Sequence, residues 1–187
     1  MWYRKNMKYD PAKHHRRSIR LKGYDYSQPG AYFVTICTQY RECLFGVVEN
    51  GRMVLNDAGK MIEKWIGALE SKFPDIKCEP FIIMPNHVHF NIHNVGIDPC
   101  VFPKNSGEHT GSPLPRVVQW FKTMTTNEYI RGVKQNRFPE FPGKLWQRNY
   151  YEHIIRNDDE LNRIREYIIN NPLKWETDRN HPDNIIT

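Results

Sequence analysis

The sequence predicts a single domain of the α+β class, with a ferredoxin-like antiparallel sheet and helices packed on one face. Two observations lead to this fold class. Segments with the two-residue alternation of strands are interleaved with segments of helical periodicity, in the order strand, hairpin, helix, strand, strand, helix, strand, helix. The 187 residues, 39% of them hydrophobic and 13% aromatic, are enough for one substantial core.

The strands are predicted from alternation and from turn residues. Residues 31–38, AYFVTICT, are β-branched or aromatic and alternate in polarity, which is typical of a strand. Residues 44–55 contain Asn50-Gly51, a dipeptide that favours a hairpin turn. Three further strands are expected over residues 77–84, 86–93 and 145–155. Pro85 has no backbone N–H, so we expect a turn between the first two of these.

Three helices are predicted from apolar faces of helical period. The first runs from about residue 56 to residue 73, with Asn56 as its N-terminal cap. The second covers residues 115–131, and the third runs from Asp158 to about Asn170. Asn157 and Glu160 have the spacing of a capping box. Pro172 is expected to end the third helix.

The segment 84–93, MPNHVHFNIH, is the first candidate for chemistry. Successive side chains of a strand point to opposite faces, so His87 and His89 are expected on one face. Two neighbouring imidazoles on a rigid strand are typical of a metal site. His93 lies on the same face, but roughly 7 Å farther along the strand. We therefore expect it outside the group of metal ligands.

The third helix carries the second candidate, because Tyr167 and Asn171 are four residues apart and share a helix face. A tyrosine beside an apolar stripe is usually a packing residue. A free phenol has a pKa near 10, so attack on a phosphate needs help. A divalent cation gives that help by stabilising developing charge, and the histidine pair is a candidate to hold it.

Positive charge is concentrated at the start of the chain. The whole sequence has a net charge of +6, while residues 1–22 alone contain eight basic residues and one acidic residue. This arm fits either a nucleic-acid contact or a solvated tail. The residues that we expect to contact DNA phosphates are Arg16, Arg17, Arg20, Lys122 and Arg131.

Other site classes are disfavoured by composition. The four cysteines, at positions 37, 43, 78 and 100, form no CxxC pair, which argues against a structural zinc site. No apolar run approaches the length of a membrane span, and no signal segment is recognised. We therefore expect a cytoplasmic protein with no membrane contact.

Three motifs in order resemble one known family. They are the His-hydrophobic-His strand, the segment 146–157 (WQRNYYEHIIRN), and the tyrosine helix that ends in residues 166–172 (EYIINNP). Together they resemble the single-tyrosine HUH transposases, and most closely the REP-associated tyrosine transposases, relatives of the IS200/IS605 group. The resemblance spans roughly residues 30–175. It implies an HUH endonuclease fold, with a transposase domain over 23–175, a basic arm over 1–22 and a tail over 176–187.

The resemblance also implies roles for individual residues. Tyr167 corresponds to the nucleophile, and His87 and His89 correspond to the metal-binding pair. Asn171 stands where related enzymes commonly carry Gln as a third ligand, and Asn is one methylene shorter. The implied cofactor is Mg²⁺ or Mn²⁺. Glu152 and His153 lie in the shared signature, and we interpret them as structural hydrogen-bonding groups between strand and helix.

The implied reaction is cleavage and rejoining of single-stranded DNA through a 5′-phosphotyrosine intermediate. The family acts on palindromic repeats that fold as hairpins, and the resemblance is compatible with a monomer or a homodimer. The sequence is also compatible with two other functions. One is a histidine-based nucleotide hydrolase, which Asn91 at the third alternate position disfavours. The other is a non-catalytic nucleic-acid-binding protein of the same fold.

Overall fold

A computed structural model describes residues 24–26, 29–95 and 114–184. The basic arm, with Arg16, Arg17 and Arg20, therefore lies outside the described residues. The strands are β1 (Gly30–Cys37), β2 (Gly46–Glu49), β3 (Arg52–Leu55), β4 (Ile76–Lys77), β5 (Phe81–Met84), β6 (His87–Asn94) and β7 (Tyr151–Ile155). The α-helices are α1 (Asp57–Lys72), α2 (Leu114–Lys134) and α3 (Asp158–Asn170). Three short 3₁₀ helices are η1 (Gln39–Arg41), η2 (Pro172–Thr177) and η3 (Pro182–Asn184).

The main sheet is antiparallel and has the strand order β4-β6-β1-β7, with β5 also paired to β6. This confirms the predicted α+β class. Strands β2 and β3 form a separate hairpin. Its turn is Asn50-Gly51, and both residues have positive φ, as the predicted hairpin turn requires.

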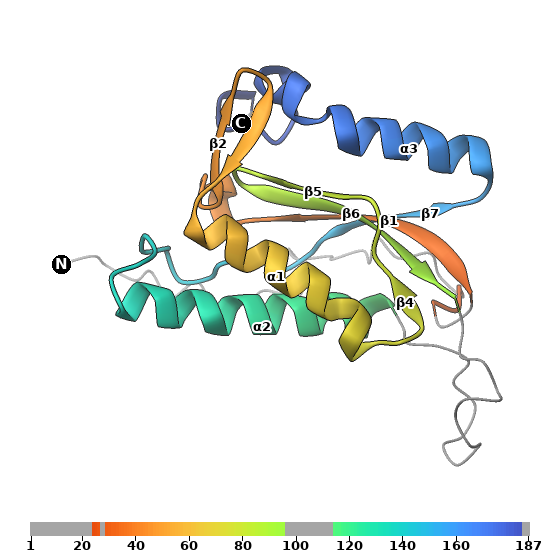
Figure 1. Ribbon diagram of the computed structural model, residues 1–187, viewed down its shortest axis with the longest axis horizontal. Coiled ribbons are helices and arrows are strands. Elements are labelled where there is room, and N and C mark those ends of the chain that lie inside the picture. Colours follow the sequence, from red (N-terminus) through yellow and green to blue (C-terminus); the bar gives the residue numbers. More distant parts are fainter. Residues whose placement is uncertain (1–23, 27–28, 96–113, 185–187) are drawn as a thin grey trace, which may run out of the picture.

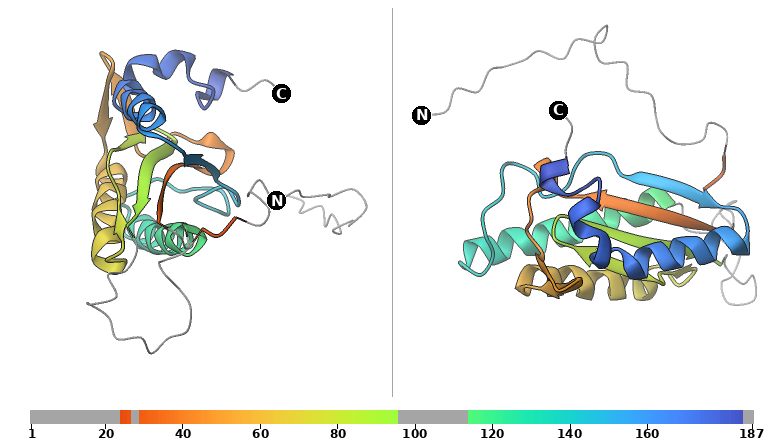
Figure 2. Two further views of the ribbon diagram at one scale, coloured as in Figure 1. Left: turned by 90° about the vertical axis from the view of Figure 1, so that its right-hand side faces the viewer. Right: turned by 90° about the horizontal axis from the view of Figure 1, so that it is seen from above.

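The helices divide between the two faces of the sheet (Figures 1 and 2). Helices α1 and α2 lie side by side on one face, as expected, and enclose the main core with β1 and β6. Helix α3 lies over the opposite face of the sheet. The expectation that all helices pack on one face therefore does not hold for α3. The sheet is therefore covered on both sides near the histidine strand.

The predicted alternation of β6 is confirmed. Val88, Phe90 and Ile92 belong to the core beneath α1 and α2. His87 and His89 are fully buried on the other face, so β6 is buried on both sides. In the pairing with β1, His89 lies opposite Thr35 and His87 lies opposite Cys37. The register thus fixes which β1 side chains lie beside each imidazole.

The helix signals match the structure closely. Asn56 caps α1 by accepting from Gly59 N at 2.9 Å, and Asn157 caps α3 by accepting from Glu160 N at 2.8 Å. Glu160 in turn accepts from Arg156 N at 2.8 Å and lies 2.7 Å from His153 Nε2. His153 thus links β7 to α3, as interpreted. The same interpretation of Glu152 is not supported, because neither of its buried carboxylate oxygens has a hydrogen-bond partner among the described residues.

Two segments differ from the expected strands. Residues 77–84 are divided into β4 and β5, because Pro80 lacks the N–H that a continuous ladder needs. Residues 145–150, expected as strand, form a loop that joins β1 through the isolated bridge between Thr38 and Trp146. Within the described residues, no helix is both long and apolar enough to cross a membrane.

Two glycines of α1 provide a paired stability test. A Cβ at Gly59 would collide with the backbone oxygen of Phe45, whereas a Cβ at Gly67 would meet open space. We expect Gly59→Ala to lower the free energy of unfolding by about 1–3 kcal/mol. Gly67→Ala should raise it by about 0.5–1 kcal/mol, since alanine favours the helix. Urea denaturation of both variants measures the difference, and equal effects would contradict the packing of α1 against Phe45.

Candidate metal centre and nucleophile

The two histidines of β6 point their Nε2 atoms at each other across 3.0 Å. Their side chains come from alternate positions of one strand, so the strand itself sets this spacing. The rings meet edge to face, with centroids 4.5 Å apart. Two ligand nitrogens held this close form a ready site for a cation.

The outer ring nitrogens are held by neighbouring side chains. His89 Nδ1 lies 2.8 Å from Thr35 Oγ1, and His87 Nδ1 lies 2.8 Å from Asn86 Oδ1. The amide nitrogen of Asn86 donates to the carbonyl oxygens of Arg41 and Asn180, at 2.9 and 2.7 Å. These two acceptors fix the orientation of the Asn86 amide. Its oxygen therefore accepts a hydrogen bond from the Nδ1–H of His87, which leaves the Nε2 lone pair of His87 directed at the site.

Burial keeps both imidazoles in the form that binds metal. Desolvation, with added repulsion from Arg41 and Arg179, lowers the pKa of His87 to about 3. Desolvation also lowers the pKa of His89 well below its ordinary value, and His87 contributes in the same direction. Both rings are therefore neutral at physiological pH. Neutral imidazole is the form that donates to a cation.

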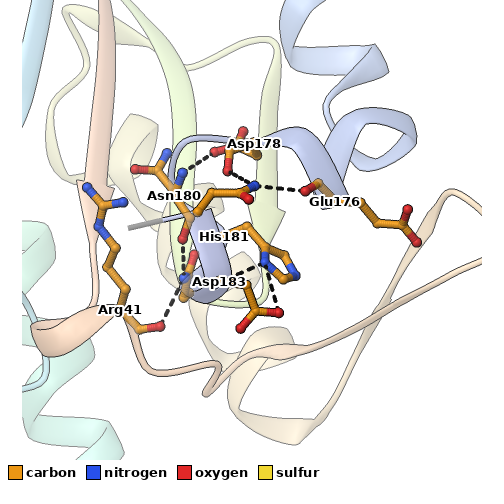
Figure 3. Close-up of polar contacts among 8 residues, drawn as sticks. Arg41, Glu176, Asp178, Asn180, His181 and Asp183 are labelled. Carbon is orange, nitrogen blue, oxygen red and sulfur yellow. Dashed lines mark hydrogen bonds and ion pairs between the residues drawn. The ribbon is translucent and has the colours of Figure 1, made fainter. Parts of the chain in front are cut away.

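Asp178 completes the cluster from the end of the described chain. Ligand atoms of His87, His89 and Asp178 all lie within 4.8 Å of one another, and all three residues are buried. The Asp178 carboxylate accepts from Asn180 N at 2.6 Å (Figure 3). It also accepts from Asn171 Nδ2 at 3.2 Å. Asp178 was not predicted from the sequence, because it lies in the expected tail, beyond the motifs. Its only sequence signal is an acidic residue within a dozen positions of the tyrosine.

The segment that carries Asp178 is attached to the sheet by several contacts. Trp175 lies 6.0 Å from His87 between ring centroids, and His181 packs on Trp175 at 4.7 Å. The carbonyl oxygen of Arg179 accepts from the Arg41 guanidinium, and that of Asn180 accepts from Asn86. Residues 172–184 are thus part of the site wall.

Tyr167 reaches the same cluster from α3. Its hydroxyl lies 3.4 Å from His89 Nε2, and its ring packs against Phe33 and His89. The side chain remains 37% exposed, so a substrate can approach the phenol. Burial and the Asp178 charge raise the pKa of Tyr167 above its ordinary value. The phenol is therefore protonated at neutral pH.

Asn171 lies at the edge of the cluster. Its amide nitrogen donates to Asp178, and its buried Oδ1 has no hydrogen-bond partner among the described residues. Helix α3 ends at Asn170, as expected, but Asn171 keeps helical backbone angles because the chain continues directly into η2. Direct metal binding by Asn171 stays a prediction, for which this unpaired buried oxygen is available.

The donor set fits a divalent cation. Two ligands at a right angle around an ion about 2.1 Å away lie about 3 Å apart, and the two Nε2 atoms lie 3.0 Å apart. The carboxylate supplies negative charge, and the unpaired Asn171 oxygen offers a further donor. Two imidazoles with one carboxylate suit a transition ion such as Mn²⁺ better than Mg²⁺, which prefers oxygen ligands.

The expected DNA contacts of the described chain lie on α2. Arg131 is exposed near the end of this helix. The Lys122 ammonium instead donates to the carbonyl oxygens of Gln147, Arg148 and Asn149, at 2.9, 3.4 and 3.2 Å. Lys122 thus holds the loop before β7, and a phosphate contact by either residue stays a prediction.

Comparison with known proteins gives two relatives, and no protein-family model matches the chain. A protein of uncharacterized function from Haemophilus influenzae is 39% identical over 184 residues, covering 94% of this chain and 98% of that protein. A candidate REP-associated tyrosine transposase from the same organism is 26% identical over 160 residues, covering 80% of this chain and 74% of that protein. The first similarity places both chains in one protein family.

Two solved structures are more distantly similar. A REP-associated tyrosine transposase bound to a REP hairpin aligns with a TM-score of 0.47 and 16% identity, covering 85% of this chain and 74% of that chain. A candidate transposase from Deinococcus radiodurans aligns with a TM-score of 0.46 and 16% identity, covering 81% of this chain and 95% of that chain.

Replacing Asp178 tests whether the cluster binds a cation. We expect Asp178→Asn to weaken Mn²⁺ binding at least about tenfold, because it removes the charged ligand while keeping the side-chain shape. Isothermal titration of the DNA-free protein with Mn²⁺ measures the change. The control is Asp183→Asn, whose side chain is 90% exposed in the same segment. Equal affinity of the two variants would exclude Asp178 as a ligand.

Proposed function

We propose that this chain is a REP-associated tyrosine transposase, a metal-dependent enzyme that cleaves and rejoins single-stranded DNA; its similarity to a candidate transposase of that family supports the proposal. One observation carries the proposal. The hydroxyl of Tyr167 lies 3.4 Å from His89 Nε2, at the edge of the cluster of His87, His89 and Asp178. A partly exposed nucleophile beside a candidate cation site is the arrangement that attack on a phosphodiester needs.

The proposed step forms one bond and breaks one. The phenolic oxygen of Tyr167 attacks the phosphorus of a backbone phosphodiester and loses its proton to water. The bond from phosphorus to the 3′-oxygen breaks, and this oxygen takes up a proton. The products are a 5′-phosphotyrosine and a free 3′-hydroxyl. A second 3′-hydroxyl reverses the step on another strand, so no external energy is required.

The side chains around Tyr167 have defined tasks in this proposal. His87, His89 and Asp178 would hold Mg²⁺ or Mn²⁺, which when bound polarises the phosphate and stabilises the charge that develops on it. Thr35 and Asn86 orient the two imidazoles from behind. Arg41 and Arg179 lie close enough to depress the His87 pKa, so their charge also acts on an incoming phosphate.

The proposed substrate is a DNA hairpin formed by a palindromic repeat. Support comes from the family resemblance and from the excess of basic residues, which favours a polyanionic partner. The proposed site admits only an unpaired or distorted strand, because the histidines are buried and Tyr167 alone is partly exposed.

A covalent adduct tests the nucleophile. We expect wild-type protein, a labelled single-stranded hairpin and Mn²⁺ to give a protein–DNA adduct that survives denaturing electrophoresis. Tyr167→Phe should reduce the adduct at least about 1000-fold, since phenylalanine keeps the ring and removes the attacking oxygen. The matched control is Tyr151→Phe, which removes a hydroxyl from the neighbouring tyrosine on Phe33.

Removing the metal tests the second requirement. A chelator should abolish the adduct, and added Mn²⁺ should restore it. An adduct that persists in Tyr167→Phe would overturn the nucleophile assignment. Nucleotide hydrolysis with no adduct would instead favour the histidine-based hydrolase, and hairpin binding with neither reaction would favour a non-catalytic binding protein.

A further inference from the structure

A groove lies outside the cluster of His87, His89 and Asp178, between α2 and the loop of residues 143–150. It encloses about 690 Å³ and is lined on one side by α2 residues such as Gln119 and Asn127. A second cavity of about 560 Å³ lies against the same loop and includes Gln39 and Tyr40. Both cavities share Gly143, Lys144, Gln147 and Arg148. The loop therefore forms a wall that is accessible from both cavities.

The charge of this groove has one sign. Among the described residues, those that line the two cavities include Lys122, Lys144 and Arg148 but no aspartate or glutamate. Lys144 and Arg148 are exposed, whereas Lys122 is occupied by three loop carbonyls. Two free cations in a cavity without carboxylates favour an anionic ligand.

The groove also carries groups that suit nucleobases. Gln119, Asn127 and Gln147 present amides, which both donate and accept hydrogen bonds. Tyr40 lines the second cavity and is 69% exposed. An exposed aromatic ring next to a cationic wall is the combination used to stack unpaired bases.

The backbone around Tyr40 is unusual and fixed. Tyr40 and Arg41 both have positive φ, 59° and 57°, which residues with a Cβ adopt at a cost. The Arg41 carbonyl accepts from Asn86, and Gln39 N donates to Leu145 O at 2.8 Å. The turn thus holds the Tyr40 ring outward, where 69% of the residue is exposed.

The same contacts connect the groove to the proposed catalytic cluster. Gln147 N donates to Cys37 O at 2.9 Å, and Cys37 lies opposite His87 in the sheet. Asn86, which orients His87, is bonded to the turn that presents Tyr40. The wall of residues 143–149 is therefore joined through β1 to the strand that carries the two histidines.

We propose that this groove binds an unpaired segment of the DNA strand next to the phosphodiester that Tyr167 attacks. Lys144 and Arg148 contact its phosphates, and Tyr40 stacks on one of its bases. The inference rests on the proposed function and adds a binding surface that selects single-stranded flanks rather than the paired stem.

Direct binding tests the groove without any chemistry. The probe is a fluorescent single-stranded DNA of about twelve nucleotides with no hairpin, and the protein is the full chain with Tyr167→Phe. We expect the double substitution Lys144→Ser and Arg148→Ser, made in this Tyr167→Phe protein, to weaken binding at least about tenfold. The slope of log affinity against log salt concentration should fall by about 0.7 per lost phosphate contact. Tyr40→Ala should weaken binding about tenfold with an unchanged slope.

The control pair is Lys60→Ser and Lys72→Ser, which removes the same charge from exposed positions of α1 outside both cavities. Circular dichroism melting checks that each variant is folded. If the two pairs have equal affinity and equal salt slope, the groove assignment is overturned. Tighter binding of an RNA of the same sequence would overturn the assignment to DNA.

The adduct assay separates this inference from the proposed function. If the wild-type chain forms the Tyr167 adduct but the groove variants bind and react normally, only the groove assignment fails. If the wild-type chain forms no adduct while the groove variants lose single-strand binding, only the proposed chemistry fails.

Discussion

The carboxamide of Asn86 is the contact on which the arrangement of the site depends. It joins three segments that are distant in sequence, through Arg41 O at 2.9 Å, Asn180 O at 2.7 Å and His87 Nδ1 at 2.8 Å. The side chain is fully buried, so each of its polar groups must be paired. One amide thereby sets the tautomer of His87, anchors the C-terminal segment and holds the turn after β1.

Much of the fold was predictable because its signals are local. The alternation of polar and apolar residues in 84–93 predicted strand β6 and placed His87 and His89 on one face of it. Asn56 and Asn157 located the starts of two helices, since capping depends only on neighbouring residues. The position of α3 on the second face was not predictable in this way, because both faces of β6 are buried and periodicity does not say what covers them.

The candidate site was only partly predictable for the same reason. Tyr167 and the histidines were named from motifs, and the structure brings them together at 3.4 Å. Asp178 has no motif, and its position results from tertiary contacts of Trp175 and Asn180 with the sheet. Lys122 was expected on DNA from charge alone. Sequence could not reveal that three carbonyls surround its ammonium.

The location of Asp178 directly after the short 3₁₀ helix η2 has a thermodynamic consequence. The histidines belong to a central strand that opens only with the whole domain, whereas a peripheral segment opens more readily. A cation that needs all three ligands would bind only the state in which residues 172–184 are docked on the sheet. The observed affinity for the cation would therefore include the free energy of docking this segment. The two processes would be thermodynamically linked, and protection of backbone amides in 172–184 against hydrogen exchange would then depend on metal concentration.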